Sequence, residues 1–250
     1  MLTLKKSLGQ HFLKDESVCI RIVEALQEKP FQQLLEVGPG GGALTKYLIN
    51  IPSVELKLVE IDQEKIDYLS SAYPAIKKNI ISGSILDIDC PFKSTFTLIG
   101  NFPYNISTQI VFKVIDWREQ IETMIGMFQK EVAVRICAGP GSKDYGIISV
   151  IAHAYFETVY LFDVDESSFN PPPKVKSGVI KMIYKGNPYE ISNHHKFKNL
   201  VKTAFAQRRK QLRNPLKPYF EKDFLGQEIF TKRAEQLSVA DFVYLLNHMK

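Results

Sequence analysis

Two kinds of apolar pattern alternate along the first half of the chain. Short apolar runs that are typical of buried strands occupy residues 34–37, 54–61, 75–82, 95–100 and 122–128. Segments with apolar residues on one helical face lie between them, at residues 43–49, 63–72, 107–115 and 132–137. Another helix is expected after Asp15, an N-cap residue, because Val18, Ile22 and Leu26 share a face. The alternation predicts an α/β fold with βαβ units on a parallel sheet.

The pattern changes after Gly139. We expect a helix at residues 147–155, followed by two long strands at residues 157–164 and 175–184. These two strands are expected to form a closing, partly antiparallel pair at one edge of the sheet.

No strand pattern remains from about residue 187 onward. Helices are predicted at residues 194–211, 218–225 and 239–249. The chain is therefore expected to divide into an α/β domain at residues 1–187 and a small all-α domain at residues 188–250. We find no internal repeat and no low-complexity segment.

Composition and charge bear on where the protein is located and on what it binds. The N-terminus lacks the apolar block of a signal peptide, and Cys19, Cys90 and Cys137 lack CxxC spacing, so we expect a reduced, cytoplasmic chain without a metal site. Residues 190–250 contain 12 Lys and Arg against 6 Asp and Glu, a net charge of +6 within a chain of +5. The preceding residues therefore carry −1. This asymmetry fits either a polyanionic partner or a solvated helical surface.

A glycine-rich stretch, LLEVGPGGGALT, joins the first predicted strand of the sheet to a helix. Its four glycines, Gly38 and the run 40–42, allow a tight turn and close approach of a ligand. The spacing differs from GxGxxG, and Glu36 would repel a phosphate, so a cationic or zwitterionic ligand fits better. A glycine-rich turn can also be purely structural.

An acidic residue, Glu60, ends the next strand and strengthens the ligand interpretation. It follows Gly38 by 22 residues, where a carboxylate in this type of sheet accepts from two ribose hydroxyls. The alternative is a strand-end carboxylate in solvent. A ribose, an aminoacyl tail and no phosphate together describe S-adenosylmethionine.

The stretch GNFPY, at the end of another strand, suggests a site for adenine. The Asn101 side-chain oxygen and the Phe102 carbonyl could accept both hydrogens of an exocyclic amine and direct its lone pair toward a methyl donor. Pro103 would fix the carbonyl, and the Tyr104 ring would stack on the base. A base within a helix could not reach this pocket, so the target must be unpaired or flipped out. Alone, such a string would more often be a loop turn, but its position after a strand of this type of sheet favours the catalytic interpretation.

The stretch SSFNPPPKVKS offers a second aromatic side chain. Three consecutive prolines favour a rigid extended loop that could present Phe169 opposite Tyr104. The alternative is that Phe169 is an ordinary core aromatic residue.

Taken together, these stretches resemble the KsgA-type small-subunit rRNA adenine dimethyltransferases, nearly from end to end. The motifs that carry the resemblance are KKSLGQHFL, EVGPGGGALT, GNFPYNIST, QKEVAVRI, GPGSKDYG, FNPPPKVKSGV, AFAQRRKQLRNPL and RAEQLSVADF. The resemblance implies a Rossmann-like class I methyltransferase sheet with a small C-terminal all-α domain. It also implies that S-adenosylmethionine donates two methyl groups to N6 of each of two adjacent adenosines in the terminal stem-loop of small-subunit rRNA.

The resemblance also implies which residues form the site. The cofactor-binding residues would be Gln10, His11, Leu13, Gly38, Gly40, Glu60, Ile61, Ser84, Ile85 and Asn101. The target adenine would be held by Asn101, Phe102, Pro103 and Tyr104, with Phe169 as the opposite wall. The residues expected to bind RNA are Arg208, Arg209, Lys210 and Arg213.

Two positions depart from the family pattern. His11 stands where the family usually has Asn, and Ser84 stands where it usually has an Asp that accepts from the cofactor's adenine amine. The nearby Asp87 is an imperfect substitute by position.

Two alternative functions share the same fold. One is a large-subunit rRNA adenine methyltransferase of the erythromycin-resistance type, which the C-terminal motifs AFAQRRKQLRN and RAEQLSVADF disfavour. The other is a non-catalytic ribosome-assembly or transcription factor, which an intact Asn101 to Tyr104 segment disfavours. We expect a monomer that acts on small-subunit rRNA within an immature 30S subunit, away from membranes and without a metal.

Overall fold

The computed structural model describes residues 11–250, which form two compact units. One unit contains the chain up to Ala133 together with Val159–Tyr184, and the other contains Val134–Thr158 together with Lys185–Lys250. The chain crosses between the units three times. The third crossing, after Tyr184, lies close to the predicted boundary at residue 187. The second unit also includes residues 134–158, which the sequence grouped with the sheet.

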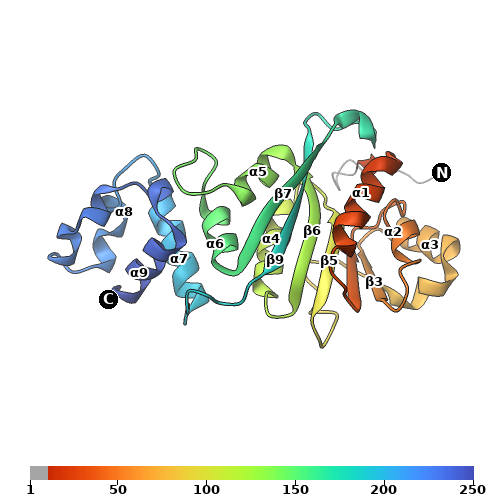
Figure 1. The fold of residues 1–250 in the computed structure, drawn as a ribbon, viewed down its shortest axis with the longest axis horizontal. Coiled ribbons are helices and arrows are strands. Elements are labelled where there is room, and N and C mark those ends of the chain that lie inside the picture. The colour runs from red at the N-terminus through yellow and green to blue at the C-terminus, as the bar shows by residue number, and fades with distance from the viewer. Residues whose placement is uncertain (1–10) are drawn as a thin grey trace. The chain divides into compact units, whose positions relative to one another are not determined.

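A seven-stranded sheet organises the first unit (Figure 1), with the strand order β4-β3-β2-β5-β6-β9-β7. The strands are β2 (Gln33–Val37), β3 (Glu55–Glu60), β4 (Ile80–Ser82), β5 (Phe96–Asn101), β6 (Ile121–Gln129), β7 (Phe156–Val164) and β9 (Ser177–Tyr184). The strands from β4 to β6 run parallel, whereas β9 runs antiparallel to β6. The predicted α/β class and the antiparallel edge are confirmed.

The order of the strands also predicts where a ligand binds. Strand β2 pairs with β3 on one side and with β5 on the other, so the chain's direction of winding reverses there. Ligands of open α/β sheets bind beyond the carboxyl ends of the strands at such a switch point. Both the glycine-rich turn after β2 and Asn101 at the end of β5 lie at this place.

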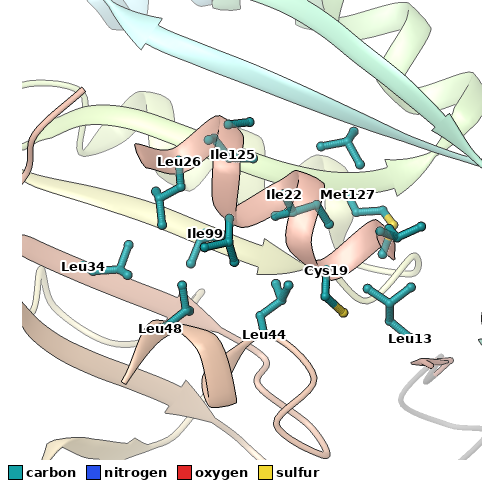
Figure 2. Packing of buried hydrophobic residues seen from close by; sticks show 14 of the residues in the cluster. Leu13, Cys19, Ile22, Leu26, Leu34, Leu44, Leu48, Ile99, Ile125 and Met127 are labelled. Atoms are coloured by element: carbon teal, nitrogen blue, oxygen red, sulfur yellow. The ribbon is translucent and has the colours of Figure 1, made fainter. Parts of the chain in front are cut away.

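A hydrophobic cluster joins the first helix to the sheet. Helix α1 (Glu16–Gln27) begins at Asp15, whose carboxylate accepts from the Ser17 N–H at 3.1 Å. In Figure 2 the apolar face of α1, with Ile22 and Leu26, lies over Ile99 and Ile125 of the central strands. Each such side chain contributes about 1.5–3 kcal/mol when it is fully buried. This packing holds the strand ends that carry the site.

The remaining helices of the first unit follow the strands in turn. They are α2 (Thr45–Leu48), α3 (Gln63–Ala72), α4 (Ser107–Asp116) and α5 (Lys130–Cys137), the last of which continues into the second unit. The predicted strand at residues 75–82 is wrong in its first part, which forms a 3-10 helix, η2 (Pro74–Asn79). Pro74 has no N–H to donate to a strand ladder and suits the start of a helical turn, and only Ile80–Ser82 pair with β3.

A second, two-stranded sheet was not predicted. Strand β1 (Phe12–Leu13) pairs antiparallel with β8 (Phe169–Asn170), so Leu13 lies opposite Phe169. The Lys14 N–H donates to the Ser168 carbonyl at 2.9 Å, and the Ser168 hydroxyl donates to Asp15 at 2.9 Å. Segments about 150 positions apart in the sequence are thereby joined beside the cluster.

From residue 185 onward the second unit contains helices and turns but no strand, which agrees with the prediction of no strand from about residue 187. It contains α6 (Ile147–Tyr155), α7 (His194–Ala206), α8 (Arg213–Leu216) and α9 (Val239–Asn247). Two helix predictions were wrong. Helix α7 ends at Ala206 instead of residue 211, and the predicted helix at residues 218–225 is replaced by short 3-10 turns, η4 (Lys217–Tyr219) and η5 (Phe224–Gly226). Further 3-10 turns, η6 (Glu228–Thr231) and η7 (Ala234–Gln236), lead to α9, which begins at the N-cap Ser238.

Candidate cofactor and adenine site

A cavity lies at the switch point of the sheet, and most of the predicted site residues line it. The predicted residues that line it are His11, Leu13, Gly38, Gly40, Glu60, Ile61, Ser84, Ile85, Asn101, Phe102, Pro103 and Tyr104. Gln10 lies outside the described residues. Phe169 is not among the described residues that line the cavity. The cavity wall also includes Phe12 and Lys65, to which the sequence analysis gave no role in binding, and Glu36, the carboxylate expected to disfavour a phosphate.

The glycine-rich turn forms one wall of the cavity in a conformation that requires glycine. Gly38 and Gly40 have φ angles of +67° and +55°, in the left-handed region. A Cβ atom on Gly40 would also lie 3.3 Å from the Phe12 ring. The turn therefore exposes backbone to the cavity where side chains would obstruct it.

The carboxylate of Glu60 is held in place by backbone N–H groups. One oxygen accepts from Gly40 at 3.1 Å, and the other accepts from Ile61 and Asp62 at 3.0 Å each. Because a carboxylate oxygen can accept more than one hydrogen bond, Glu60 retains lone pairs for a ligand hydroxyl. The strand end and the glycine-rich turn are thus fixed to each other through this side chain.

Glu36 is buried beside the same turn. Removal from water raises the pKa of Glu36 to about 8, the Thr45 hydroxyl opposes this rise by donating to it at 2.7 Å, and the nearby Glu60 charge adds to it. Burial therefore favours the neutral, protonated form of this carboxyl group. The cavity is less negative than its two glutamates suggest from the sequence.

The amide of Asn101 has a fixed orientation. Its Nδ2 donates to the backbone carbonyl of His11 at 3.2 Å. Since a carbonyl can only accept, this bond keeps the amide nitrogen on the His11 side and leaves Oδ1 available as an acceptor. The acceptor that the adenine hypothesis requires is thereby provided.

His11 also connects Tyr104 to the proline-rich loop at residues 171–173. Its ring stacks on Tyr104 with the centroids 5.6 Å apart and the planes at 30°. Its Nδ1–H donates to the Pro171 carbonyl at 2.9 Å. The Tyr104 hydroxyl shares a hydrogen bond of 2.5 Å with Ser177, and burial raises the pKa of this phenol, so Tyr104 stays neutral.

The ring of Phe102 serves as an anchor. It is buried, lies 5.0 Å from the Phe128 ring, and fills the space beside two glycines that are register partners, Gly100 on β5 and Gly126 on β6. A Cβ on Gly100 or Gly126 would lie 2.6 Å or 2.2 Å from this ring. The sequence analysis missed the role of these glycines, although a glycine at matching positions of two apolar strands was a usable signal.

Phe169 lies in the hydrophobic cluster. Its side chain is 1% exposed and belongs to the same buried cluster as Leu13 and α1. The structure therefore does not bring Phe169 and Tyr104 together across the cavity. Asp87, the possible substitute for an acidic acceptor, is exposed and is absent from the residues described as lining the cavity.

The basic residues of the second unit differ in their surroundings. Arg208 donates to the Lys143 carbonyl at 2.5 Å and lies 3.6 Å from the Glu235 carboxylate. Arg209, Lys210 and Arg213 are exposed. The predicted RNA-binding cluster thus contains one arginine with a structural role.

Comparison with known proteins identifies the family. The family model for ribosomal RNA adenine dimethylase matches residues 1–250. The chain belongs to this family. Proteins called ribosomal RNA small subunit methyltransferase A from Flavobacterium johnsoniae and Porphyromonas gingivalis are 52% and 44% identical to it. The alignments cover 96% of this chain in both cases, and 94% and 95% of the two relatives.

Solved structures agree with this membership. A dimethyladenosine transferase from Plasmodium falciparum superposes with a TM-score of 0.82 at 25% identity, over 96% of this chain and 99% of that one. The 23S rRNA methyltransferase ErmE has the same fold, with a TM-score of 0.72 at 23% identity, over 95% of this chain and 100% of that one. The predicted resemblance, the methyltransferase fold, the enzyme class and the cofactor, S-adenosylmethionine, are confirmed.

The cavity fits this cofactor. Ile61 lines it with 57% of its surface exposed, an apolar face suited to a nucleobase, and the Glu60 carboxylate is positioned for hydroxyl groups. The glycine-rich turn lines the same cavity without side chains, which suits an aminoacyl tail. Within residues 11–250, no helix is long and apolar enough to cross a membrane.

Proposed function

We propose that this protein dimethylates N6 of each of two adjacent adenosines in the terminal stem-loop of small-subunit rRNA, with S-adenosylmethionine as the methyl donor. The observation that carries the proposal is the orientation of Asn101, whose Nδ2 is bound to the His11 carbonyl and whose Oδ1 is left to accept. A pocket that presents an available acceptor, a neighbouring carbonyl and an aromatic face suits an adenine amine.

Different residues bind different parts of S-adenosylmethionine. The turn at Gly38 and Gly40 receives the methionine end, Glu60 accepts from the ribose hydroxyls, and Ile61 and Ile85 cover the adenine ring. Ser84 replaces a charged acceptor near the adenine amine. His11, Leu13 and Gln10 complete the cofactor side, with Gln10 proposed on the family resemblance alone.

Catalysis by this chain is a matter of orientation and electrostatics. When bound, the cofactor supplies a methyl group activated on a sulfonium. Asn101 Oδ1 and the Phe102 carbonyl accept the two hydrogens of the adenine amine and keep its lone pair directed at that group. Tyr104 stacks on the base, which enters unpaired or flipped. A strong base is unnecessary, since the methylated ammonium product is itself acidic.

The basic second unit selects the RNA. Arg209, Lys210 and Arg213 are exposed and suited to phosphate contacts, which supply affinity and register with little reading of sequence. Arg208 supports them through its contacts with Glu235 and Lys143. The partner is the immature 30S subunit in the cytoplasm, and the protein acts as a monomer without a metal ion.

The test is to incubate the protein with undermethylated small subunits and labelled S-adenosylmethionine, and then to map the label on the rRNA. We expect four methyl groups per subunit, two on each of two adjacent adenosines. Label on the large subunit, in a parallel incubation, would support an enzyme of the erythromycin-resistance type. No label on either subunit, despite cofactor binding, would support a non-catalytic assembly factor.

A further inference from the structure

The segment after β4 forms a single helical turn against the cavity. The N–H groups of Asp87 and Ile88 donate to the Ser84 carbonyl at 3.0 and 3.1 Å. The Ser84 hydroxyl accepts from the Leu86 N–H at 3.1 Å, so this hydroxyl closes the start of the turn. Three residues of the turn line the cavity, namely Ser84, Ile85 and Leu86.

A lysine from a different element caps the other end of this turn. Lys113, on α4, donates to the carbonyls of Leu86 and Ile88 at 3.1 and 2.9 Å. The last carbonyls of a helical turn have no partner within the turn, and a cation at that end is stabilising. The ammonium also lies 4.7 Å from the centre of the Trp117 ring, which limits where it can move.

We propose that Lys113 is a positioning residue for the adenine end of S-adenosylmethionine. Lys113 does not line the cavity in the described structure. It acts through the turn from Ser84 to Ile88, whose position relative to α4 it fixes by its two hydrogen bonds. Since Ser84 and Ile85 both line the cavity, recognition of the cofactor adenine depends on where the turn places these two residues. This inference rests on the cofactor site proposed above.

Lys57 provides a matched control. It donates to the Pro91 carbonyl at 2.8 Å and lies 4.3 Å from the centre of the Phe92 ring, so it shares the carbonyl and ring contacts of Lys113, and it also lies 3.3 Å from the Glu55 carboxylate. Neither Pro91 nor Phe92 is among the described residues that line the cavity. Loss of Lys57 should therefore disturb a neighbouring loop and leave the cofactor site as it was.

The experiment compares Lys113→Met, Lys113→Arg and Lys57→Met by calorimetric binding of S-adenosylmethionine and by thermal unfolding. We expect Lys113→Met to raise the Kd about tenfold, while kcat at saturating cofactor stays within about twofold. Lys113→Arg should restore most of the affinity because a guanidinium can donate to both carbonyls. Lys57→Met should lower the melting temperature with an unchanged Kd.

An unchanged Kd for Lys113→Met, together with a lowered melting temperature like that of Lys57→Met, would overturn the proposal. Trp117 offers a second test on the unaltered protein, because it is the chain's single tryptophan. Methylthioadenosine, which carries the adenine end, should change Trp117 emission, and methionine should not. If Lys113→Met does not fold, unchanged emission with methylthioadenosine would overturn the proposal instead.

These readouts separate this inference from the proposed function. A wild-type protein that binds S-adenosylmethionine but does not methylate subunits would refute the function and leave the role of Lys113 standing. A wild-type protein that methylates subunits, with an unchanged Kd in Lys113→Met, would refute only the role of Lys113.

Discussion

The segment that is proposed to hold the target adenine and the segment proposed to hold RNA differ in how far they are fixed beforehand. Asn101, Phe102 and Tyr104 each have a partner that sets their orientation: the His11 carbonyl, two facing glycines and Ser177. In the basic segment Arg208 is held by Glu235, whereas Arg209 and Arg213 are exposed. Chemistry at one nitrogen requires fixed acceptors, and phosphate contacts tolerate mobile side chains.

This contrast predicts that substitutions in the adenine segment act on rate and those in the basic segment on salt-dependent affinity. The largest effect is expected for Asn101→Ala. Loss of the orienting acceptor should lower kcat on small subunits by about 100-fold or more, whereas the Kd for S-adenosylmethionine should change only a few-fold.

Asn105→Ala is the control for this substitution, because Asn105 also lines the cavity but is exposed. Single-turnover methylation and calorimetry measure the two quantities. Turnover of Asn101→Ala within a few-fold of wild type would contradict the assigned role.

A smaller effect is expected when the anchor beneath the segment is disturbed. In Gly126→Ala the new Cβ would lie 2.2 Å from the Phe102 ring, so that ring must move. Overpacking of this kind costs about 1–3 kcal/mol of stability. The methylation rate should fall about tenfold as the Phe102 carbonyl shifts.

Two variants sharpen this test. Gly139→Ala should be neutral in denaturant unfolding, since apart from its two chain neighbours no described residue comes within 4 Å of a Cβ there. Phe102→Leu, added to Gly126→Ala, should recover part of the stability because it shortens the clashing side chain. If Gly126→Ala is as stable and as fast as wild type, the packing does not constrain the segment.

Substitution of Phe169 distinguishes between two roles for this side chain, packing in the core and stacking on the base. Its 1% exposure predicts that Phe169→Leu costs about 1 kcal/mol in unfolding and leaves kcat within about threefold. A stacking wall predicts the reverse, a loss of about 1–3 kcal/mol in transition-state binding with little change in stability. Parallel denaturant unfolding and methylation assays decide between the two.

The smallest effect is expected in the basic segment. Arg209→Gln combined with Arg213→Gln should weaken subunit binding and reduce the log–log salt slope by roughly one unit for each phosphate that the protein no longer neutralises. Binding of S-adenosylmethionine should not change.

Arg208→Gln serves as the comparison in this segment. It should mainly lower the melting temperature, because it removes the interactions with Glu235 and Lys143. Subunit binding measured across a salt titration is the readout. Coincident slopes for wild type and the double variant would mean that the segment is a solvated helix face.

Most of the architecture and the location of the site could be predicted from the sequence. The apolar runs and the glycine-rich turn predicted the parallel sheet, and Glu60 and Asn101 were found at strand ends, because local periodicity and strand-end chemistry are readable over a few neighbouring residues. The same local reading failed at Pro74–Asn79, where apolar residues in a 3-10 helix look like those of a strand.

Other features depend on contacts between residues that are distant in the sequence. Pairing of β1 with β8 placed Phe169 in the core, and facing glycines on two strands turned the Phe102 ring into an anchor. The bond from Asn101 to the His11 carbonyl set the direction of an amide, and that from Lys113 to Leu86 capped a turn from another helix. Residues separated by tens of positions are brought together only by the tertiary structure. Of these contacts, only the pair of strand glycines left a readable signal in the sequence.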